Sequence, residues 1–95
     1  MLLTIWLACA RDNLNKILTY IVYESAPVAQ QMKKLLGDSA LPLAKHPYLY
    51  RQNERVPRLQ EILAHQNYLI LYRVTEKQIE ITSVVHVCRE FSIPT

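Results

Sequence analysis

Residues 59–87 have the sequence LQEILAHQNYLILYRVTEKQIEITSVVHV, and this stretch decides the fold. From residue 58 onward the hydrophobic pattern takes a period of two, which is typical of β-strands. It predicts three strands, at residues 59–64, 68–74 and 78–87. The separators, 65–67 and 75–77, have the length of hairpin loops, so we expect an antiparallel meander.

The same period predicts which side chains share a face of the last strand. One face should carry Ile79, Ile81, Ser83, Val85 and Val87, and the other Glu80, Thr82, Val84 and His86. We expect one face of the sheet to pack on helices. The opposite, partly polar face is then available for a functional site.

Two helices are predicted before the meander. A helical period over residues 10–23 is formed by Leu14, Ile17, Leu18, Ile21 and Val22. A second helix should begin at Ser25-Ala26-Pro27, because serine caps exposed amides and proline suits a first helical turn. Gly37 and Pro42 argue against an uninterrupted helix to Lys45, and we expect a kink or a break between them. The short link between the helices requires an antiparallel hairpin.

Two segments flank these elements. The apolar start of the chain, through Ala10, imitates a signal peptide, but it is short and no Lys or Arg precedes it. We therefore expect a first β-strand there, and no segment is long enough to span a membrane. Residues 46–57 lack a clear period and are predicted to form a surface loop.

Together these elements predict an α+β fold: an N-terminal strand, an antiparallel helical hairpin and a three-stranded antiparallel meander packed on the helices. The 95 residues suit a single domain, 1–95. Hydrophobic residues make up 51% and charged residues 20%, which excludes a disordered chain. The net charge of +3 favours acidic partners, either nucleic acid or an acidic protein.

Cofactor and metal sites are not predicted. Cys9 and Cys88 lack the spacing of a zinc or redox motif, and we expect buried free thiols. The three histidines, His46, His65 and His86, are too dispersed for a metal site. Gly37 is the only glycine, so a phosphate-cradling glycine loop is excluded.

Several motifs, in order, resemble the ParE branch of the RelE/ParE toxin–antitoxin superfamily. Residues 68–74, YLILYRV, are similar to that family's "YRIIYRV" strand, residues 83–89 to its closing "V-x-H-x-x-R", and residues 59–62 to its "L-R-E-L". The helical half is similar to its "A-x-x-D-L-x-x-I-x-x-Y-I" opening, and Pro42 to Pro47 occupy the place of its "L-x-x-x-P". The resemblance extends from Trp6 to Arg89. Gln60 and Leu69 depart from it, because the family usually has a basic residue there.

The resemblance implies a cytoplasmic bacterial toxin that a cognate antitoxin, encoded beside it, holds inactive in a toxin–antitoxin hetero-oligomer. ParE-like members inhibit DNA gyrase, whereas RelE-like members cut messenger RNA on the ribosome. We expect the antitoxin to bind an apolar site on the helical hairpin and the sheet edge. A degenerate member that binds antitoxin without toxicity is a further alternative.

The nuclease alternative would need a base, an acid and cations around a phosphate. Its candidates are His86, Arg89, Arg73, Arg58 and Glu61. A purely structural role for His86 and Arg89 is the competing interpretation. The tail, residues 90–95, lacks the Tyr or His that often completes a RelE-like site.

The gyrase hypothesis requires no active site, because inhibition can depend on a complementary surface. Aromatic residues and arginine dominate binding hot spots, and this predicts a target-binding set of Tyr48, Tyr50, Arg51, Arg55 and Arg89. The competing interpretation is that Tyr48 and Leu49 cover the end of the core. We therefore expect a protein inhibitor more than an enzyme.

Overall fold

The computed structural model describes residues 2–56 and 58–87. Strand β1 (Leu3–Trp6) leads into helices α1 (Ala8–Glu24) and α2 (Ala26–Ser39), followed by a 3-10 turn, η1 (Leu41–Ala44). Strands β2 (Gln60–His65), β3 (Tyr68–Val74) and β4 (Gln78–His86) complete the fold. The predicted α+β architecture is confirmed, as are both helices and the three-stranded meander.

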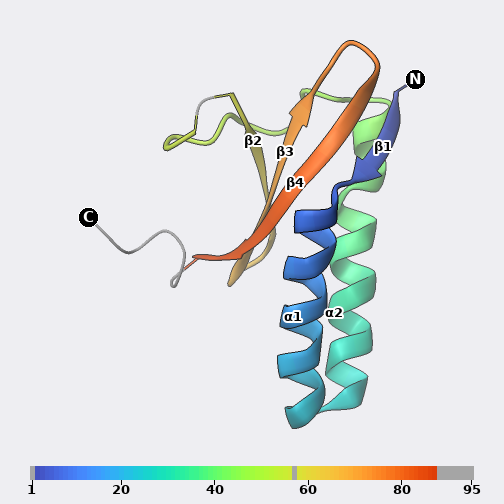
Figure 1. Cartoon of the computed structure of the whole chain (residues 1–95), viewed down its shortest axis with the longest axis vertical. Coiled ribbons are helices and arrows are strands. Elements are labelled where there is room, and N and C mark those ends of the chain that lie inside the picture. The colour runs from blue at the N-terminus through green and yellow to red at the C-terminus, as the bar shows by residue number, and fades with distance from the viewer. Residues whose placement is uncertain (1, 57, 88–95) are drawn as a thin grey trace.

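The helical hairpin is built as its sequence requires. Ser25 caps α2, because its Oγ accepts a hydrogen bond from the Val28 amide at 3.4 Å. The predicted break is present, since α2 ends at Ser39 and η1 follows. In Figure 1 the two helices lie against the sheet and extend well past its lower end, so the hairpin tip protrudes from the domain.

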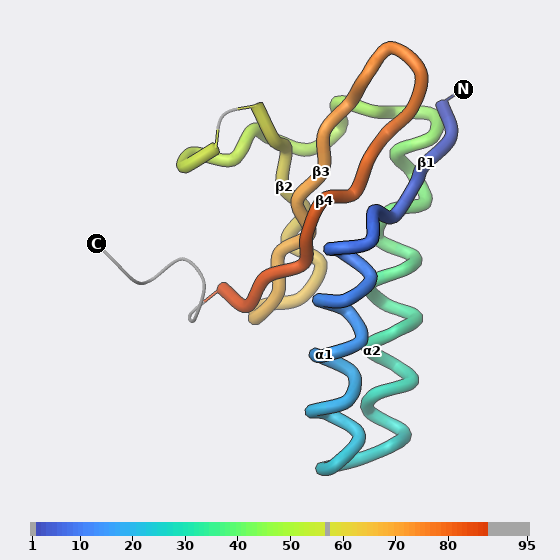
Figure 2. The backbone as a smooth tube through the Cα atoms, in the orientation of Figure 1, coloured from blue at the N-terminus to red at the C-terminus, as the bar shows by residue number. Residues whose placement is uncertain are grey.

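The sheet has the order β1-β4-β3-β2. Strand β1 pairs parallel with β4, with Thr4 opposite Ile79 and Trp6 opposite Ile81, whereas the other pairings are antiparallel. The first strand thus lies beside the last, and both outer strands, β1 and β2, are edges of the sheet. Figure 2 shows the blue tube of β1 running beside the orange tube of β4.

The core lies between the sheet and the hairpin. Its fully buried large side chains come from α2, η1 and two strands: Leu36, Leu43, Ile70, Tyr72, Ile79 and Ile81. The Tyr72 hydroxyl donates a hydrogen bond to the Pro47 carbonyl at 3.0 Å, which ties the loop after η1 to the core.

One prediction about the faces of β4 is wrong. Between β3 and β4 the register shifts, because Leu71 lies opposite Ser83 whereas Tyr72 lies opposite Ile81. Thr82 is the extra residue of this β-bulge, and its Oγ1 donates to the Leu71 carbonyl at 3.2 Å. Beyond the bulge, Val84 and His86 therefore turn to the helix side, with Ile79 and Ile81, instead of sharing a face with Glu80.

The cysteine prediction is also corrected in part. Cys9 lies in the first turn of α1 and is exposed, not buried. Cys88 lies outside the described residues. No described helix is long and apolar enough to cross a membrane.

Candidate partner-binding surfaces

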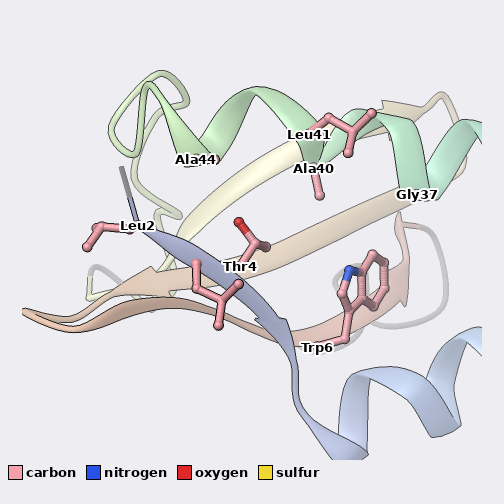
Figure 3. Close-up of a pocket in the computed structure, with 8 residues that line it drawn as sticks. Leu2, Thr4, Trp6, Gly37, Ala40, Leu41 and Ala44 are labelled. Atoms are coloured by element: carbon pink, nitrogen blue, oxygen red, sulfur yellow. The ribbon is translucent and has the colours of Figure 1, made fainter.

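An apolar groove separates β1 from the end of α2 and from η1. It has a volume of about 490 Å³ and is lined by Leu2, Leu3, Thr4, Trp6, Gly37, Ala40, Leu41 and Ala44. Figure 3 shows Thr4 and Trp6 pointing from β1 toward the helical segment that carries Gly37 and Ala40. Three of the four lining residues on the helical side, Gly37, Ala40 and Ala44, are small, which leaves space in front of the strand.

The groove is accessible and can accept a larger side chain. Leu3 and Leu41, on its two sides, are 67% and 70% exposed. A Cβ placed on Gly37 would meet no atom within 4 Å, so this glycine opens directly into free space. An exposed apolar groove of this kind is typical of a surface that binds a partner.

The edge of β1 adds hydrogen-bonding groups to the groove. The Leu7 amide donates to the Ile81 carbonyl at 3.0 Å, so every second residue before it, Ile5 and Leu3, also turns its backbone toward β4. Thr4 and Trp6 consequently turn their backbone groups away from the sheet. Farther along, the Leu2 amide donates to Ala44 at 3.3 Å and closes one end of the groove. The open part of the edge can accept another strand.

The second surface is the loop of residues 45–56, the predicted location of the target-binding anchors. Tyr48 is 69% exposed and Leu49 is 55% exposed. Tyr50 is half-buried and packs against the core. Arg51 forms an ion pair with Glu61 at 3.0 Å, and Arg55 is exposed. Tyr50 therefore holds the shape of the loop from inside, whereas Tyr48, Leu49, Arg51 and Arg55 lie on its exposed surface.

Asn53, which sequence reasoning missed, holds this loop in place. It is buried, and its Nδ2 donates to Glu61 at 2.9 Å. Its Oδ1 accepts hydrogen bonds from the amides of Arg55 at 3.0 Å and Val56 at 2.8 Å. Asparagine often bonds to the backbone just after it in turns, which was the available signal. Next to it, the Glu61 amide donates to the Arg51 carbonyl at 2.9 Å and fixes the loop on the edge of β2.

Two of the nuclease candidates, His86 and Arg73, lie on opposite faces of the sheet. Arg73 pairs with Glu80 at 2.6 Å on the face away from the helices, whereas the bulge turns His86 to the helix side. Tyr68, the partner of His86, and Arg73 lie at opposite ends of β3, roughly 16 Å apart at about 3.3 Å per residue. Arg58 is exposed, and Arg89 lies outside the described residues.

Glu61, the candidate base, is engaged as well, as is Glu80, the partner of Arg73. Glu61 accepts hydrogen bonds from both Arg51 and Asn53. Hydrogen bonds from Gln78 and then Arg73 lower the pKa of Glu80, which favours its charged form. Among the described residues, no three His, Cys, Asp or Glu side chains are grouped as metal ligands.

Comparison with protein-family models identifies one family. Residues 4–91 match the family model for the ParE toxin of the type II toxin–antitoxin system parDE. A solved structure titled "Chromosomal ParDE TA system from P. aeruginosa" is similar to this chain with a TM-score of 0.81. The identity is 19%, over 90% of this chain and 96% of that one, so this likeness concerns the fold. Among curated protein sequences, none matches.

Proposed function

The chain belongs to the ParE family, the toxins of parDE type II toxin–antitoxin systems, and from this premise we propose that it inhibits DNA gyrase by protein contact and is neutralised by a cognate antitoxin. Such a toxin acts in the cytoplasm, where its target is. The observation that carries the proposal is the loop of residues 45–56. Hydrogen bonds to Asn53 fix its backbone, and Tyr48 and Leu49 are exposed on it. The proposal that an antitoxin binds this chain rests on the apolar groove beside β1.

The antitoxin should bind by adding a strand to the β1 edge. Backbone groups of Thr4 and Trp6 are available to a strand on that side, and the groove next to them accepts apolar side chains. A strand that pairs with β1 carries every second side chain to the groove. An apolar side chain there would pack on the Trp6 indole and on Ala40, and it would bury apolar surface of the groove that is otherwise exposed to solvent.

Gly37 provides a sharp test of this site. Gly37→Leu should fill the groove without disturbing the fold, because the position opens into free space. We expect antitoxin affinity, measured by isothermal titration calorimetry, to fall by about tenfold or more. Gly37→Ala is the matched control and should bind within about threefold of the wild type. Full affinity of Gly37→Leu would place the antitoxin elsewhere.

The gyrase contact is proposed for the exposed part of the loop. Tyr48, Leu49, Arg51 and Arg55 are exposed, and Arg51 also pairs with Glu61. Tyr50 packs against the core and contributes by fixing the loop. A fixed loop loses little conformational entropy on binding, which favours affinity. An exposed tyrosine with an exposed leucine beside it has the composition of a binding hot spot. Arg89 stays in the proposed set as a prediction from sequence.

A supercoiling assay with purified gyrase tests this contact directly. Tyr48→Ala should raise the concentration needed for half-inhibition by about tenfold or more, the typical effect of a hot spot. Tyr23→Ala is the matched control, because Tyr23 is 87% exposed on the hairpin tip, away from the loop. Equal inhibition by wild type and Tyr48→Ala would remove the loop from the proposal.

Pulse labelling after induction without antitoxin tests the target. Early failure of DNA synthesis supports gyrase, and early collapse of protein synthesis supports a RelE-like nuclease acting on ribosome-bound messenger RNA. Unaffected synthesis of both, with antitoxin binding retained, identifies a non-toxic member. The separation of His86 from Arg73 favours the first outcome.

A further inference from the structure

A second cleft lies between α1 and the ends of β3 and β4, away from the β1 groove and from the loop. Its volume is about 470 Å³, within the usual range for small-molecule pockets. Helix α1 contributes Asn13, Lys16, Ile17 and Tyr20, and the sheet contributes Asn67, Tyr68, Val84 and His86. The bulge at Thr82 creates this cleft, since it turns Val84 and His86 toward α1.

The polar side of the cleft is rich in hydrogen-bond donors. Its lining includes no carboxylate, and Lys16 forms no ion pair with a described residue. The Asn13 Oδ1 already accepts from the Val84 amide, so its Nδ2 is the group left to bind a ligand. Asn67 uses its backbone amide for His65 and its carbonyl for Val87, which leaves its side-chain amide for the same purpose. Such a set suits an anion.

The other side of the cleft is apolar and held rigidly. Ile17 and Val84 form an aliphatic wall, and Tyr68 lies beside them. The Tyr68 ring is fixed by His86 in an edge-on contact at 5.2 Å and by His65 at 5.8 Å. A flat ligand group can pack on this wall while a charged group reaches Lys16.

We infer that this cleft binds a phosphate monoester whose remaining part is a flat ring system, a ligand of the size and chemistry of a nucleoside monophosphate. The three terminal oxygens of a phosphate monoester can each accept from one donor: the ammonium of Lys16 and the side-chain amides of Asn13 and Asn67. A carboxylate has only two oxygens for these three groups. In this cleft side chains would bind the phosphate, whereas in many nucleotide-binding proteins the backbone amides of a glycine-rich loop do so. The inference stands apart from gyrase inhibition, because no residue of the cleft belongs to the proposed target or antitoxin surfaces.

Titration of the full chain, followed by amide chemical shifts, tests the site. The probes are adenosine monophosphate, adenosine, inorganic phosphate and glutamate. We expect saturable binding of adenosine monophosphate, with the largest shifts at Lys16, Asn67 and Val84, and binding at least about tenfold weaker for the other three. Lys16→Gln should weaken binding by about tenfold or more, since it removes a charged hydrogen bond.

Lys33→Gln is the matched control, because it removes the same charge from the exposed surface of α2 and should leave affinity unchanged. Absence of saturable binding at millimolar adenosine monophosphate would overturn the inference. Equal affinity of Lys16→Gln and wild type would do the same, as would equal affinity for glutamate. An unchanged spectrum of Lys16→Gln without ligand shows that the variant folds, so a lost response reports on binding.

Discussion

Asn13, on α1, accepts a hydrogen bond through Oδ1 from the backbone amide of Val84, 71 residues later, at 3.0 Å. This bond joins the helical hairpin to the last strand directly after the bulge at Thr82. The Val84 amide points away from β3, because the Val87 amide donates to the Asn67 carbonyl and every second residue of β4 faces β3. Strand β1 pairs with β4 only as far as Ile81, so it offers this amide no partner, and a buried amide without a partner is costly. Asn13 thus stabilises the register that directs Val84 and His86 to the helix side.

Asn13→Ala should therefore destabilise the fold. The Val84 amide, on a residue only 3% exposed, would lose its partner at a cost of about 1–3 kcal/mol, and the better helix propensity of alanine would offset less than about 1 kcal/mol. We expect the Tm to fall by roughly 4–8 °C per kcal/mol. Asn15→Ala, at an exposed position of the same helix, should leave the Tm unchanged or raise it. A wild-type Tm for Asn13→Ala would contradict the role of this bond.

The same bond explains how far sequence could predict this fold. Local patterns were sufficient for the helices, the break after Gly37 and the three strands of the meander, because period, caps and turn lengths are local properties. The bulge was missed since Asn13, which stabilises the register beyond it, lies on another element. An uninterrupted period of two then assigned His86 to the wrong face.

The candidate site was predicted less completely for the same reason. The loop was found from its missing period and its aromatic residues, and Tyr48 is exposed as an anchor should be. Arg51 pairs with Glu61, and Tyr72 binds the loop through the Pro47 carbonyl. Both partners are distant from the loop in sequence, so a local pattern could not show these contacts. The apolar groove arises from the parallel pairing of β1 with β4, which no local pattern specifies.

Asn53→Ala should loosen the loop while the sheet stays folded. It removes three hydrogen bonds, those to Glu61, Arg55 and Val56, with an expected loss of about 2–3 kcal/mol in urea denaturation. Trypsin should then cut faster after Arg51 and Arg55, and gyrase inhibition should weaken. Glu54→Ala, its exposed neighbour, is the control and should do neither. Slow cleavage of Asn53→Ala would mean that the loop is held by other contacts.

Gly37→Ala should stabilise the toxin slightly. The added methyl group meets no atom within 4 Å, and alanine loses less backbone entropy than glycine in a helix. Because Gly37 is close to the end of α2, we expect a gain of about 0.5 kcal/mol in the free energy of unfolding. Chemical denaturation measures it. A loss of stability would mean that the added methyl group meets other atoms, and that the groove beside Gly37 is narrower than described above.

Tyr72 should make stability sensitive to alkaline pH. Burial raises the pKa of the Tyr72 phenol above its ordinary value of 10.0, and a hydrogen bond from the Tyr50 backbone offsets part of this increase. Since the folded pKa exceeds the unfolded one, the stabilisation is complete below pH 10 and is lost as the pH rises through the folded pKa. Wild-type unfolding free energy should therefore decline steeply above pH 10.

Tyr72→Phe isolates that contribution. At neutral pH it should cost about 1 kcal/mol, because the hydrogen bond to the Pro47 carbonyl is lost. Above pH 10 the difference should shrink, since phenylalanine carries no group that must ionise. Denaturation curves between pH 7 and 11 measure this decrease, with Tyr23→Phe as the control, because Tyr23 is exposed and its variant should follow the wild type throughout. Parallel curves for wild type and Tyr72→Phe over this range would mean that ionisation of another group governs alkaline unfolding.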